Sequence, residues 1–344
     1  MIRICTSLTE VNYEIELVGR LRFSSIPLQN QQFRQKRLSC FFNKGKFFYI
    51  EFNIRLFFYL LFKYSDAYSA VDLDTIVACT LVAKVKSKKL IFDAHEYFEE
   101  VPEVTERPAI KRTWQAVGKW FIPQVDLAYT VNQSLAQLFT ANYQTCFEVI
   151  RSVPYPYGHV ARAKSDTKVI LYQGALNKGR GLPQLILAMK GINAQCWIAG
   201  EGDLSGTLRN LVEEQGLKKK VIFLGYLQPY ELKEITCKAY IGYNVMENIG
   251  LSYYYSLANK FFDYVQAEIP QVCAPFPEYN TILQQFEVGV TCNCQIDEIK
   301  STLNNLLSND IIYSKLQNEC LKAKKVFNWE DEDEKLKSLY LNVV

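Results

Sequence analysis

Short apolar runs, rich in β-branched and aromatic residues, recur along the whole chain with helical stretches between them. We expect these runs to be strands. The first series comprises Ile15–Val18, Phe48–Phe52, Thr75–Cys79, Leu90–Asp93, Leu127–Val131 and Phe147–Ile150. The second comprises Val169–Gln173, Cys196–Ala199, Val221–Leu224, Tyr240–Tyr243, Gln271–Ala274 and Val288–Cys292. Strands that alternate with helices form parallel sheets covered on both faces, so the pattern predicts an α/β protein with two doubly wound domains.

A segment dense in Pro, Gly and charge, Val153–Asp166, separates the two series and is typical of an interdomain linker. The second histidine of the chain, His159, lies in it, and we expect that side chain to be solvated. A length of 344 residues fits two domains. We expect an N-terminal domain over 1–155, a C-terminal domain over 156–325 and a terminal helix within 326–344.

Composition narrows the class of protein. Hydrophobic residues make up 49% and charged residues 22%, as in ordinary folded chains, and a net charge of +3 is too small to predict a nucleic-acid partner. The charge is uneven, because residues 1–64 hold ten Lys or Arg against four Asp or Glu. The longest apolar run, Leu56–Phe62, is too short for a bilayer, and Cys292-x-Cys294 lacks the second pair of a zinc site. We expect a cytoplasmic protein without a metal.

The segment Phe41–Tyr64 carries eleven aromatic residues among twenty-four, together with four basic ones. One interpretation is a strand over Phe47–Phe52 followed by a core helix over Ile54–Lys63. The other is a peripheral contact with the inner face of a membrane, where aromatic and basic residues suit lipid head groups. Both interpretations remain open at the level of sequence.

The most informative loop follows the strand Val169–Gln173. It contains Gly174, Gly179, Arg180 and Gly181, and Pro183 then suits the first turn of a helix. Exposed amides, the positive end of a helix and a guanidinium together predict a phosphate site. The alternative is a plain strand-to-helix turn with a solvated arginine. Neither a P-loop nor a dinucleotide glycine fingerprint occurs, so kinases and dehydrogenases are disfavoured.

Further motifs follow in order: Ala199-Gly-Glu-Gly202, Phe223-Leu-Gly225, a loop Glu247-Asn-Ile-Gly-Leu251, and an acidic residue, Asp263, in a helix that ends before Pro270. Taken with Asp93-Ala-His-Glu96 and the terminal Asn328-Trp-Glu330, the arrangement resembles the retaining, nucleotide-sugar-dependent glycosyltransferases of the GT-B fold, family four. The resemblance extends over nearly the whole chain and implies two Rossmann-like domains that face each other across a cleft. It also implies that the terminal helix packs back on the N-terminal domain.

The resemblance assigns roles to residues of this sequence. Arg180 and Lys260 would neutralise the donor diphosphate, Glu247 would meet the sugar hydroxyls, and Asp263 would hold the ribose. His95 would lie against the donor sugar, although packing or capping is the alternative for this residue. The implied donor-binding set is Gly174, Gly179, Gly181, Gly200, Glu201, Leu224, Asn248, Ile249, Gly250, Leu251 and Asp263.

The implied reaction is sugar transfer from a UDP- or GDP-linked donor to a saccharide or lipid-linked acceptor, in surface polysaccharide or glycoconjugate assembly. No cofactor and no metal is expected; we interpret Asp72-Leu-Asp74 as a turn and cap before a strand. Two alternatives stay open. One is an impaired or inactive sugar-nucleotide-binding protein, and the other is a non-hydrolysing sugar-nucleotide epimerase of the same fold.

Two departures from the family pattern stand out. The second acidic residue is Asp263, one methylene shorter than the family's glutamate. The segment Met1–Leu8 resembles the middle of the family's first helix, so the first strand and its glycine loop are expected to be missing. From this we expect a less stable N-terminal domain and reduced activity.

Overall fold

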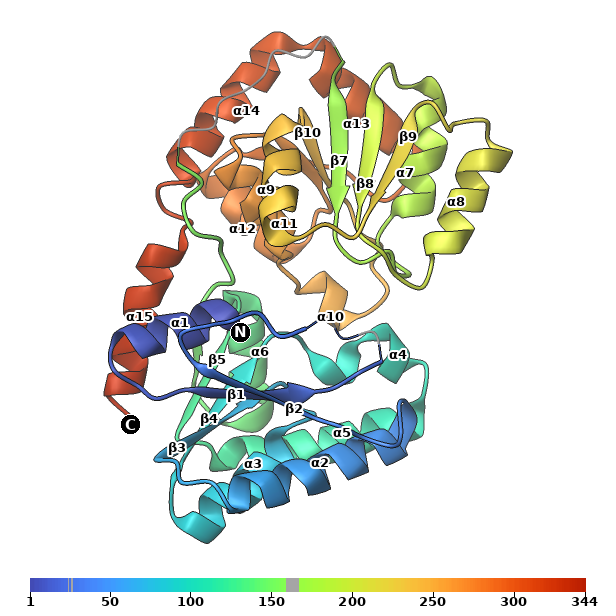
Figure 1. The fold of residues 1–344 in the computed structure, drawn as a ribbon. Helices are drawn as coiled ribbons and strands as arrows, with labels where there is room; N and C mark the ends of the chain where they lie inside the picture. The colour runs from blue at the N-terminus through green and yellow to red at the C-terminus, as the bar shows by residue number, and fades with distance from the viewer. Residues whose placement is uncertain (24, 26, 159–166) are drawn as a thin grey trace. The chain divides into compact units, whose positions relative to one another are not determined.

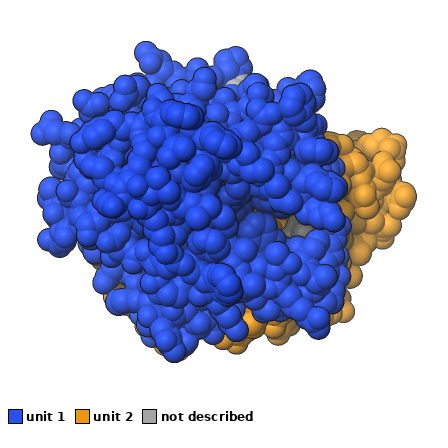
Figure 2. Space-filling view, turned by 90° about the horizontal axis from the view of Figure 1, so that it is seen from below, with its two compact units in different colours: residues 1–151, 332–344 blue, residues 152–331 orange. Residues whose placement is uncertain are grey.

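The computed structural model describes residues 1–23, 25, 27–158 and 167–344. The linker expected over Val153–Asp166 therefore lies partly, and His159 wholly, outside the described residues. The chain divides into two compact units (Figures 1 and 2). Unit 1 comprises Met1–Arg151 with Glu332–Val344, and unit 2 comprises Ser152–Asp331. These limits differ by a few residues from the expected boundaries after 155 and 325.

Unit 2 is built on a six-stranded sheet in the order β12-β11-β10-β7-β8-β9, with every pair parallel. Its strands are β7 (Val169–Gln173), β8 (Gln195–Ala199), β9 (Val221–Gly225), β10 (Ile241–Asn244), β11 (Gln271–Cys273) and β12 (Gly289–Thr291). All six coincide with expected strands. Its helices are α7 (Leu182–Ala188), η3 (Met189–Gly191), α8 (Ser205–Glu214), α9 (Pro229–Lys238), α10 (Leu251–Tyr254), α11 (Asn259–Gln266), α12 (Pro277–Gln285), α13 (Ile296–Ser308) and α14 (Asp310–Ala323).

Helices cover both faces of this sheet (Figure 1). Alternate residues of β7 show why, because Ile170 and Tyr172 belong to one apolar cluster and Leu171 to another. The first cluster takes side chains from α7, α8, α13 and α14, and the second from α9 and α11. The sheet is therefore buried on both sides, as a parallel sheet requires.

Unit 1 contains two separate parallel sheets. A four-stranded sheet has the order β3-β4-β5-β6, and β1 pairs with β2 in a second sheet. The strands are β1 (Glu16–Arg20), β2 (Arg34–Leu38), β3 (Ala67–Val71), β4 (Lys89–Ala94), β5 (Leu127–Thr130) and β6 (Phe147–Val149). The helices are α1 (Ile2–Glu10), α2 (Gly45–Leu61), α3 (Ile76–Lys86), η1 (Phe98–Glu100), α4 (Pro102–Thr105), α5 (Pro108–Phe121), η2 (Ile122–Gln124) and α6 (Gln133–Tyr143).

Two expected strands of unit 1 are wrong. Phe48–Phe52 lies inside α2, and Thr75–Cys79 forms the cap and first turn of α3. Both helices are apolar around most of their circumference, so they lack the polar face that would distinguish a helix from a strand in the sequence. The strand β3 was missed because it follows the polar segment Tyr64–Asp66, and β2 because it is largely basic.

The last helix, α15 (Trp329–Leu341), runs across the limit between the units. Its unit 1 part places Tyr340 against Tyr129, with their hydroxyl oxygens 3.3 Å apart, and Lys337 pairs with Glu10 of α1 at 2.9 Å. In the part of the chain that the structure describes, no helix combines the length and apolar character needed to span a bilayer.

Candidate functional site

The candidate donor site lies where the strand order of unit 2 reverses. After β7 the chain continues to β8 and β9 on one side, and then β10 returns to pair with β7 on the other. β7 and β10 are therefore neighbouring strands, and the loops that follow them leave the carboxyl edge of the sheet side by side and then diverge. Such a switch point is the usual ligand crevice of a doubly wound sheet. The Gly174–Gly181 loop follows β7, and the Val245–Gly250 loop follows β10.

Glycines allow the loops after β7, β8 and β9 to approach one another. The N–H of Gly174 donates to Ala199 at 2.9 Å, and the N–H of Gly200 donates to Gly225 at 2.7 Å. A Cβ on Gly200 would lie 2.0 Å from the carbonyl oxygen of Gly174, and Gly200 has a φ of +138°. Both the close contact and the positive φ exclude a side chain at position 200. The glycine at this position therefore fixes where the β7 loop can lie.

Hydrogen bonds join the β7 loop to β10 and to the loop that follows it. The N–H of Glu247 donates to the carbonyl of Gly179 at 2.9 Å, and the hydroxyl of Tyr243 donates to the carbonyl of Gly181 at 3.0 Å. A Cβ on Gly179 would lie 2.4 Å from Ile249. The structure thus brings together Gly179, Arg180, Gly181 and the Glu247–Leu251 loop, which are separated by more than sixty positions in the sequence.

Two cations meet at this point. The guanidinium carbon of Arg180 lies 4.6 Å from the ring centroid of Tyr253, and Arg180 Nη1 contacts the sulfur of Met246 at 3.1 Å. Lys260, the second residue of α11, is 8% exposed, and its Nζ lies 3.6 Å from the ring centroid of Tyr172. Aromatic faces hold both cations in place. Within the described ranges neither cation forms an ion pair, and Arg180 Nε is buried without a hydrogen-bond partner.

The environment of Lys260 disfavours its charge. Burial lowers the pKa of its ammonium group well below the ordinary value, and the charge of Arg180 lowers it further, while Asp263 acts in the opposite sense. An anion bound beside the two cations would offset both the burial of Lys260 and the repulsion by Arg180, and would thereby raise the pKa of Lys260. The arrangement is therefore suited to bind a group with more than one negative charge.

Asp263 is held from two sides by residues that sequence reasoning missed. The hydroxyl of Tyr157 donates to its Oδ1 at 3.1 Å, and the side-chain amide of Gln173 donates to its Oδ2 at 2.8 Å. The hydroxyl of Thr236 in turn donates to Gln173 at 2.8 Å. The sequence offers a signal for a functional role of Gln173, because it is the one polar residue of an apolar strand. It offers none for Tyr157, which lies in the linker.

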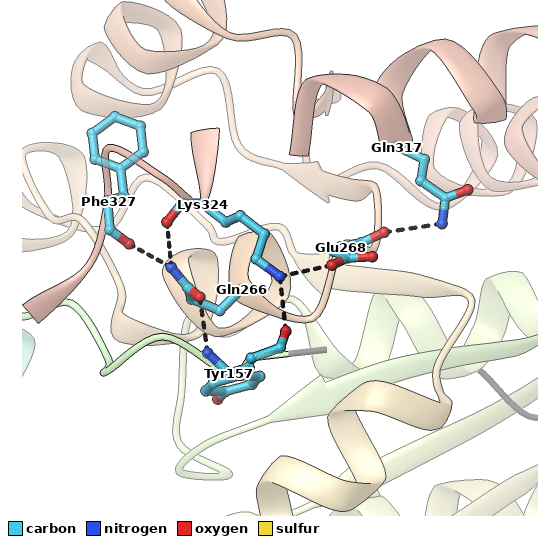
Figure 3. A network of polar contacts seen from close by, with 7 residues as sticks. Tyr157, Gln266, Glu268, Gln317, Lys324 and Phe327 are labelled. Carbon is cyan, nitrogen blue, oxygen red and sulfur yellow. Dashed lines mark hydrogen bonds and ion pairs between the residues drawn. The ribbon is translucent and has the colours of Figure 1, made fainter. Parts of the chain in front are cut away.

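A buried network fixes the far end of α11, the helix that carries Lys260 and Asp263 (Figure 3). The side-chain amide of Gln266 donates to the carbonyls of Lys324 and Phe327, each at 2.8 Å, and accepts from the N–H of Tyr157 at 3.2 Å. Lys324 also pairs with Glu268 at 2.7 Å. Gln266 is fully buried with both ends of its amide bonded, so the network positions α11 rigidly.

The remaining expected donor residues differ in their surroundings. The carboxylate of Glu247 accepts from Gln184 at 3.3 Å, and Asn248, Gly250 and Leu251 lie beside it at the start of α10. The N–H of Ile249 donates to the carbonyl of Glu247 at 3.1 Å within a tight turn, and the presentation of this amide to a ligand stays a prediction. Glu201 pairs with Arg209, and Leu224 packs against the apolar cluster beneath the sheet.

A second cluster lies in unit 1, at the carboxyl ends of β3 and β4. His95 directly follows β4, and its Nε2 is 3.2 Å from Oδ2 of the buried Asp93. The N–H of His95 donates to Oδ1 of Asp72 at 2.8 Å. Asp72 follows β3 and precedes the helix α3, so the expectation that the Asp72–Asp74 turn lies before a strand is wrong. Asp72 caps the loop after β4 through its carboxylate. Its φ of +54° is unusual for a non-glycine residue.

Burial and charge shift three pKa values in unit 1. Burial by itself would lower the pKa of His95, but the adjacent carboxylate of Asp93, and then the charge of Asp72, raise it above its ordinary value. Burial raises the pKa of Asp72 to about 7, against the opposing charge of His95. Burial likewise raises the pKa of Glu99 to about 7, although the hydroxyl of Tyr143 donates to its carboxylate at 2.7 Å. Glu99 was not anticipated from the sequence.

Solved structures share this architecture. Sucrose-phosphate synthase from Thermosynechococcus elongatus superposes with a TM-score of 0.78 at 15% identity, covering 99% of this chain and 91% of that one. HepE of Anabaena in complex with UDP-glucose gives 0.72 at 11% identity, covering 90% and 86%. A glycosyltransferase from Rickettsia africae gives 0.71 at 13% identity, covering 99% and 93%. The fold is that of the GT-B glycosyltransferases.

The family model "Glycosyl transferases group 1" matches residues 159–326, which fall within unit 2. An uncharacterized glycosyltransferase of Methanocaldococcus jannaschii is 38% identical over 76 residues. That match spans 21% of this chain and 20% of the length of that relative.

Proposed function

We propose that this protein is a retaining glycosyltransferase that moves a sugar from a UDP- or GDP-linked donor to a saccharide or lipid-linked acceptor, as a step in surface polysaccharide or glycoconjugate assembly. The observation that carries the proposal is the pair Arg180 and Lys260 at the switch point of the sheet. Arg180 is partly buried and Lys260 is buried, and in the described residues neither forms an ion pair with a carboxylate. A diphosphate supplies the missing negative charge. The matched domain family and the UDP-glucose complex of HepE support a nucleotide-linked donor.

In the proposed reaction the bond between the sugar C1 and the diphosphate oxygen breaks, and a bond from C1 to the acceptor oxygen forms on the same face. The acceptor proton passes to the departing diphosphate. Arg180 and Lys260 stabilise the charge that develops on that group, which is electrostatic preorganisation and requires no metal ion. Glu247 and the amides of Gly250 and Leu251 would hold the sugar, and Asp263 would hold the ribose.

His95 has a different proposed role. Because Asp93 favours its charged form, the imidazolium can donate hydrogen bonds and bear positive charge during transfer. It belongs to unit 1, whereas the two cations belong to unit 2, so we propose that it serves turnover more than nucleotide binding. We also propose a cytoplasmic location, which suits a chain whose ten cysteines, all within the described residues, form no disulfide.

The deciding experiment measures turnover. The purified chain is incubated with UDP- and GDP-linked sugars, with and without EDTA, and free sugar and nucleotide diphosphate are quantified; the anomer first released is identified by proton NMR. We expect slow donor hydrolysis that persists in EDTA, with retention at C1, and its loss in His95→Ala at unchanged nucleotide affinity. Nucleotide binding without any turnover would leave only a binding protein and would overturn the proposed activity.

A further inference from the structure

One face of α2 is apolar and open to solvent. Phe47, Ile50, Ile54 and Phe58 follow one another at intervals of three or four residues, and each is more than half exposed. Phe62, directly after the helix, is 83% exposed. The opposite side of α2 is apolar too, since Phe52 and Leu56 are buried against the domain. A helix that is apolar around most of its circumference but covered on only one side has an apolar face left for a partner.

The exposed face continues onto α3, which packs beside α2. The side-chain oxygen of Asn53 accepts from the N–H of Ala78 at 3.2 Å, and the ammonium of Lys86 donates to the carbonyl of Leu60 at 3.2 Å. On α3, one turn apart, Leu81 is 44% and Val85 66% exposed. We call Phe47, Ile50, Ile54, Phe58, Phe62, Leu81 and Val85 the α2–α3 apolar face. Figure 2 views unit 1 from the side on which α2 and α3 lie in Figure 1.

Cations border the α2–α3 apolar face. Lys46 Nζ lies 5.2 Å from the ring centroid of Phe47, and the guanidinium carbon of Arg55 lies 5.1 Å from that of Phe41. Lys44, Lys46 and Lys84 are exposed, and in the described part of the chain none of the three forms an ion pair. The one acid of α2, Glu51, accepts the N–H groups of Phe41 and Phe42 at 2.9 Å and pairs with Arg55.

We propose that the α2–α3 apolar face docks on an anionic lipid bilayer, with α2 parallel to the membrane and its exposed side chains in the region between head groups and acyl chains. The central stripe offers no polar group that a protein partner would have to satisfy. Its cationic margin complements anionic head groups and would repel the same margin of a second copy. The proposal goes beyond sugar transfer and does not depend on it, because it concerns a surface of unit 1 alone.

The test is sedimentation of the full chain with vesicles of phosphatidylcholine, with or without added phosphatidylglycerol. We expect binding to the anionic vesicles and little to the neutral ones. Two variants address the two components. Ile54→Glu with Phe58→Glu places charge in the centre of the stripe and should abolish binding, whereas Lys44→Glu with Lys46→Glu removes cations. Since one cation near an anionic surface changes partitioning about fivefold, losing two should weaken binding roughly 25-fold or more.

Ile311→Glu is the matched control, because Ile311 of α14 is an isolated side chain in unit 2 that is 85% exposed. It should bind vesicles as the unaltered chain does. Thermal unfolding of each variant shows whether its fold is intact, and both altered stripe residues are exposed. Equal binding by Ile54→Glu with Phe58→Glu would overturn the proposal. The proposal would also be overturned if the wild-type chain stayed in solution with both vesicle types. It would equally be overturned if the chain bound no vesicles but formed a concentration-dependent dimer that these substitutions dissociate.

Discussion

The carboxylate of Asp93, near the end of strand β4, lies 3.2 Å from Nε2 of His95, which directly follows that strand. Asp93 is 1% exposed, so its charge acts on the imidazole with little screening by water. We predict that Asp93→Asn moves the pKa of His95 from above its ordinary value to below it, because burial then becomes the dominant effect. A proton NMR titration is practical, since the chain contains only two histidines.

The assignment in that titration comes from the spectrum of His95→Gln. Asp66→Asn is the control, because Asp66 is a carboxylate of the same unit that pairs with Lys88 at the surface. It should leave the pKa of His95 unchanged. A pKa that is the same in Asp93→Asn and in the wild type would show that the pair does not set the charge of His95.

Unit 1 should lose stability as the pH rises. Asp72 and Glu99 titrate at about 7 in the folded state, against ordinary values of 3.8 and 4.5, so the folded state binds more protons than the unfolded state between these limits. Stability therefore falls from about pH 4 to about pH 7. His95 acts in the same direction, since the stability from its raised pKa is present below 6.5 and is lost as the pH rises through its folded pKa.

Calorimetry at pH 5.5 and pH 8 tests this, with the unit 2 transition identified by its increase on addition of UDP. We expect two transitions, and only the one that UDP leaves unchanged should move to lower temperature at pH 8. Asp72→Asn should reduce that movement, because asparagine can accept the N–H of His95 without titrating. A unit 1 transition that rises with pH would contradict the assignment of these carboxyl groups.

Arg180→Ala should weaken UDP or GDP binding by tenfold to a hundredfold. A hydrogen bond from a cation to diphosphate contributes about 1.5–3 kcal/mol, and the guanidinium has no competing carboxylate in the described chain. Isothermal calorimetry gives the affinity. Arg209→Ala is the matched control, since Arg209 is an exposed cation of the same unit that already pairs with Glu201. Unchanged affinity in Arg180→Ala would show that the β7 loop does not bind the phosphates.

Asp263→Asn should weaken UDP binding roughly tenfold or more if the carboxylate accepts from the ribose hydroxyls. The same substitution should have little effect on binding of 2′,3′-dideoxy-UDP, which lacks these donors. Tyr157→Phe removes one hydrogen bond to Asp263 without changing its charge and should give a smaller loss. An equal loss for both nucleotides would assign Asp263 to the support of α11 and not to the ligand.

Gly200→Ala should disrupt the donor loops. The new Cβ would lie 2.0 Å from a backbone oxygen of Gly174, so the β7 loop must shift. We expect a lower unfolding temperature of unit 2 and loss of nucleotide binding. Gly206→Ala in α8 is the control: a Cβ there meets nothing within 4 Å, and alanine favours a helix by about 0.5–1 kcal/mol. Comparable losses in both variants would mean that the close approach of the two loops is not required.

The sequence by itself predicted the fold class, because strands such as Val169–Gln173 are recognisable from their apolar composition and from the glycine that follows. It also located most of the candidate donor site, because a glycine-flanked Arg180, the Glu247 loop and Asp263 are local motifs. It failed on Phe48–Phe52 and Thr75–Cys79. There, apolar side chains cover every face of a helix, one side packed on unit 1 and the other exposed, so no periodicity separates helix from strand.

Only the tertiary structure decided which distant groups meet. The order of strands places the β7 loop beside the β10 loop, where neither Arg180 nor Lys260 forms an ion pair with a carboxylate of the described chain. Side-chain direction decided that Tyr157 and Gln173 bond to Asp263, and the backbone conformation of the β10 loop decided that the Ile249 N–H bonds within its own turn. A sequence encodes local conformation through neighbouring residues, whereas burial and charge at a site depend on contacts between segments far apart in the chain.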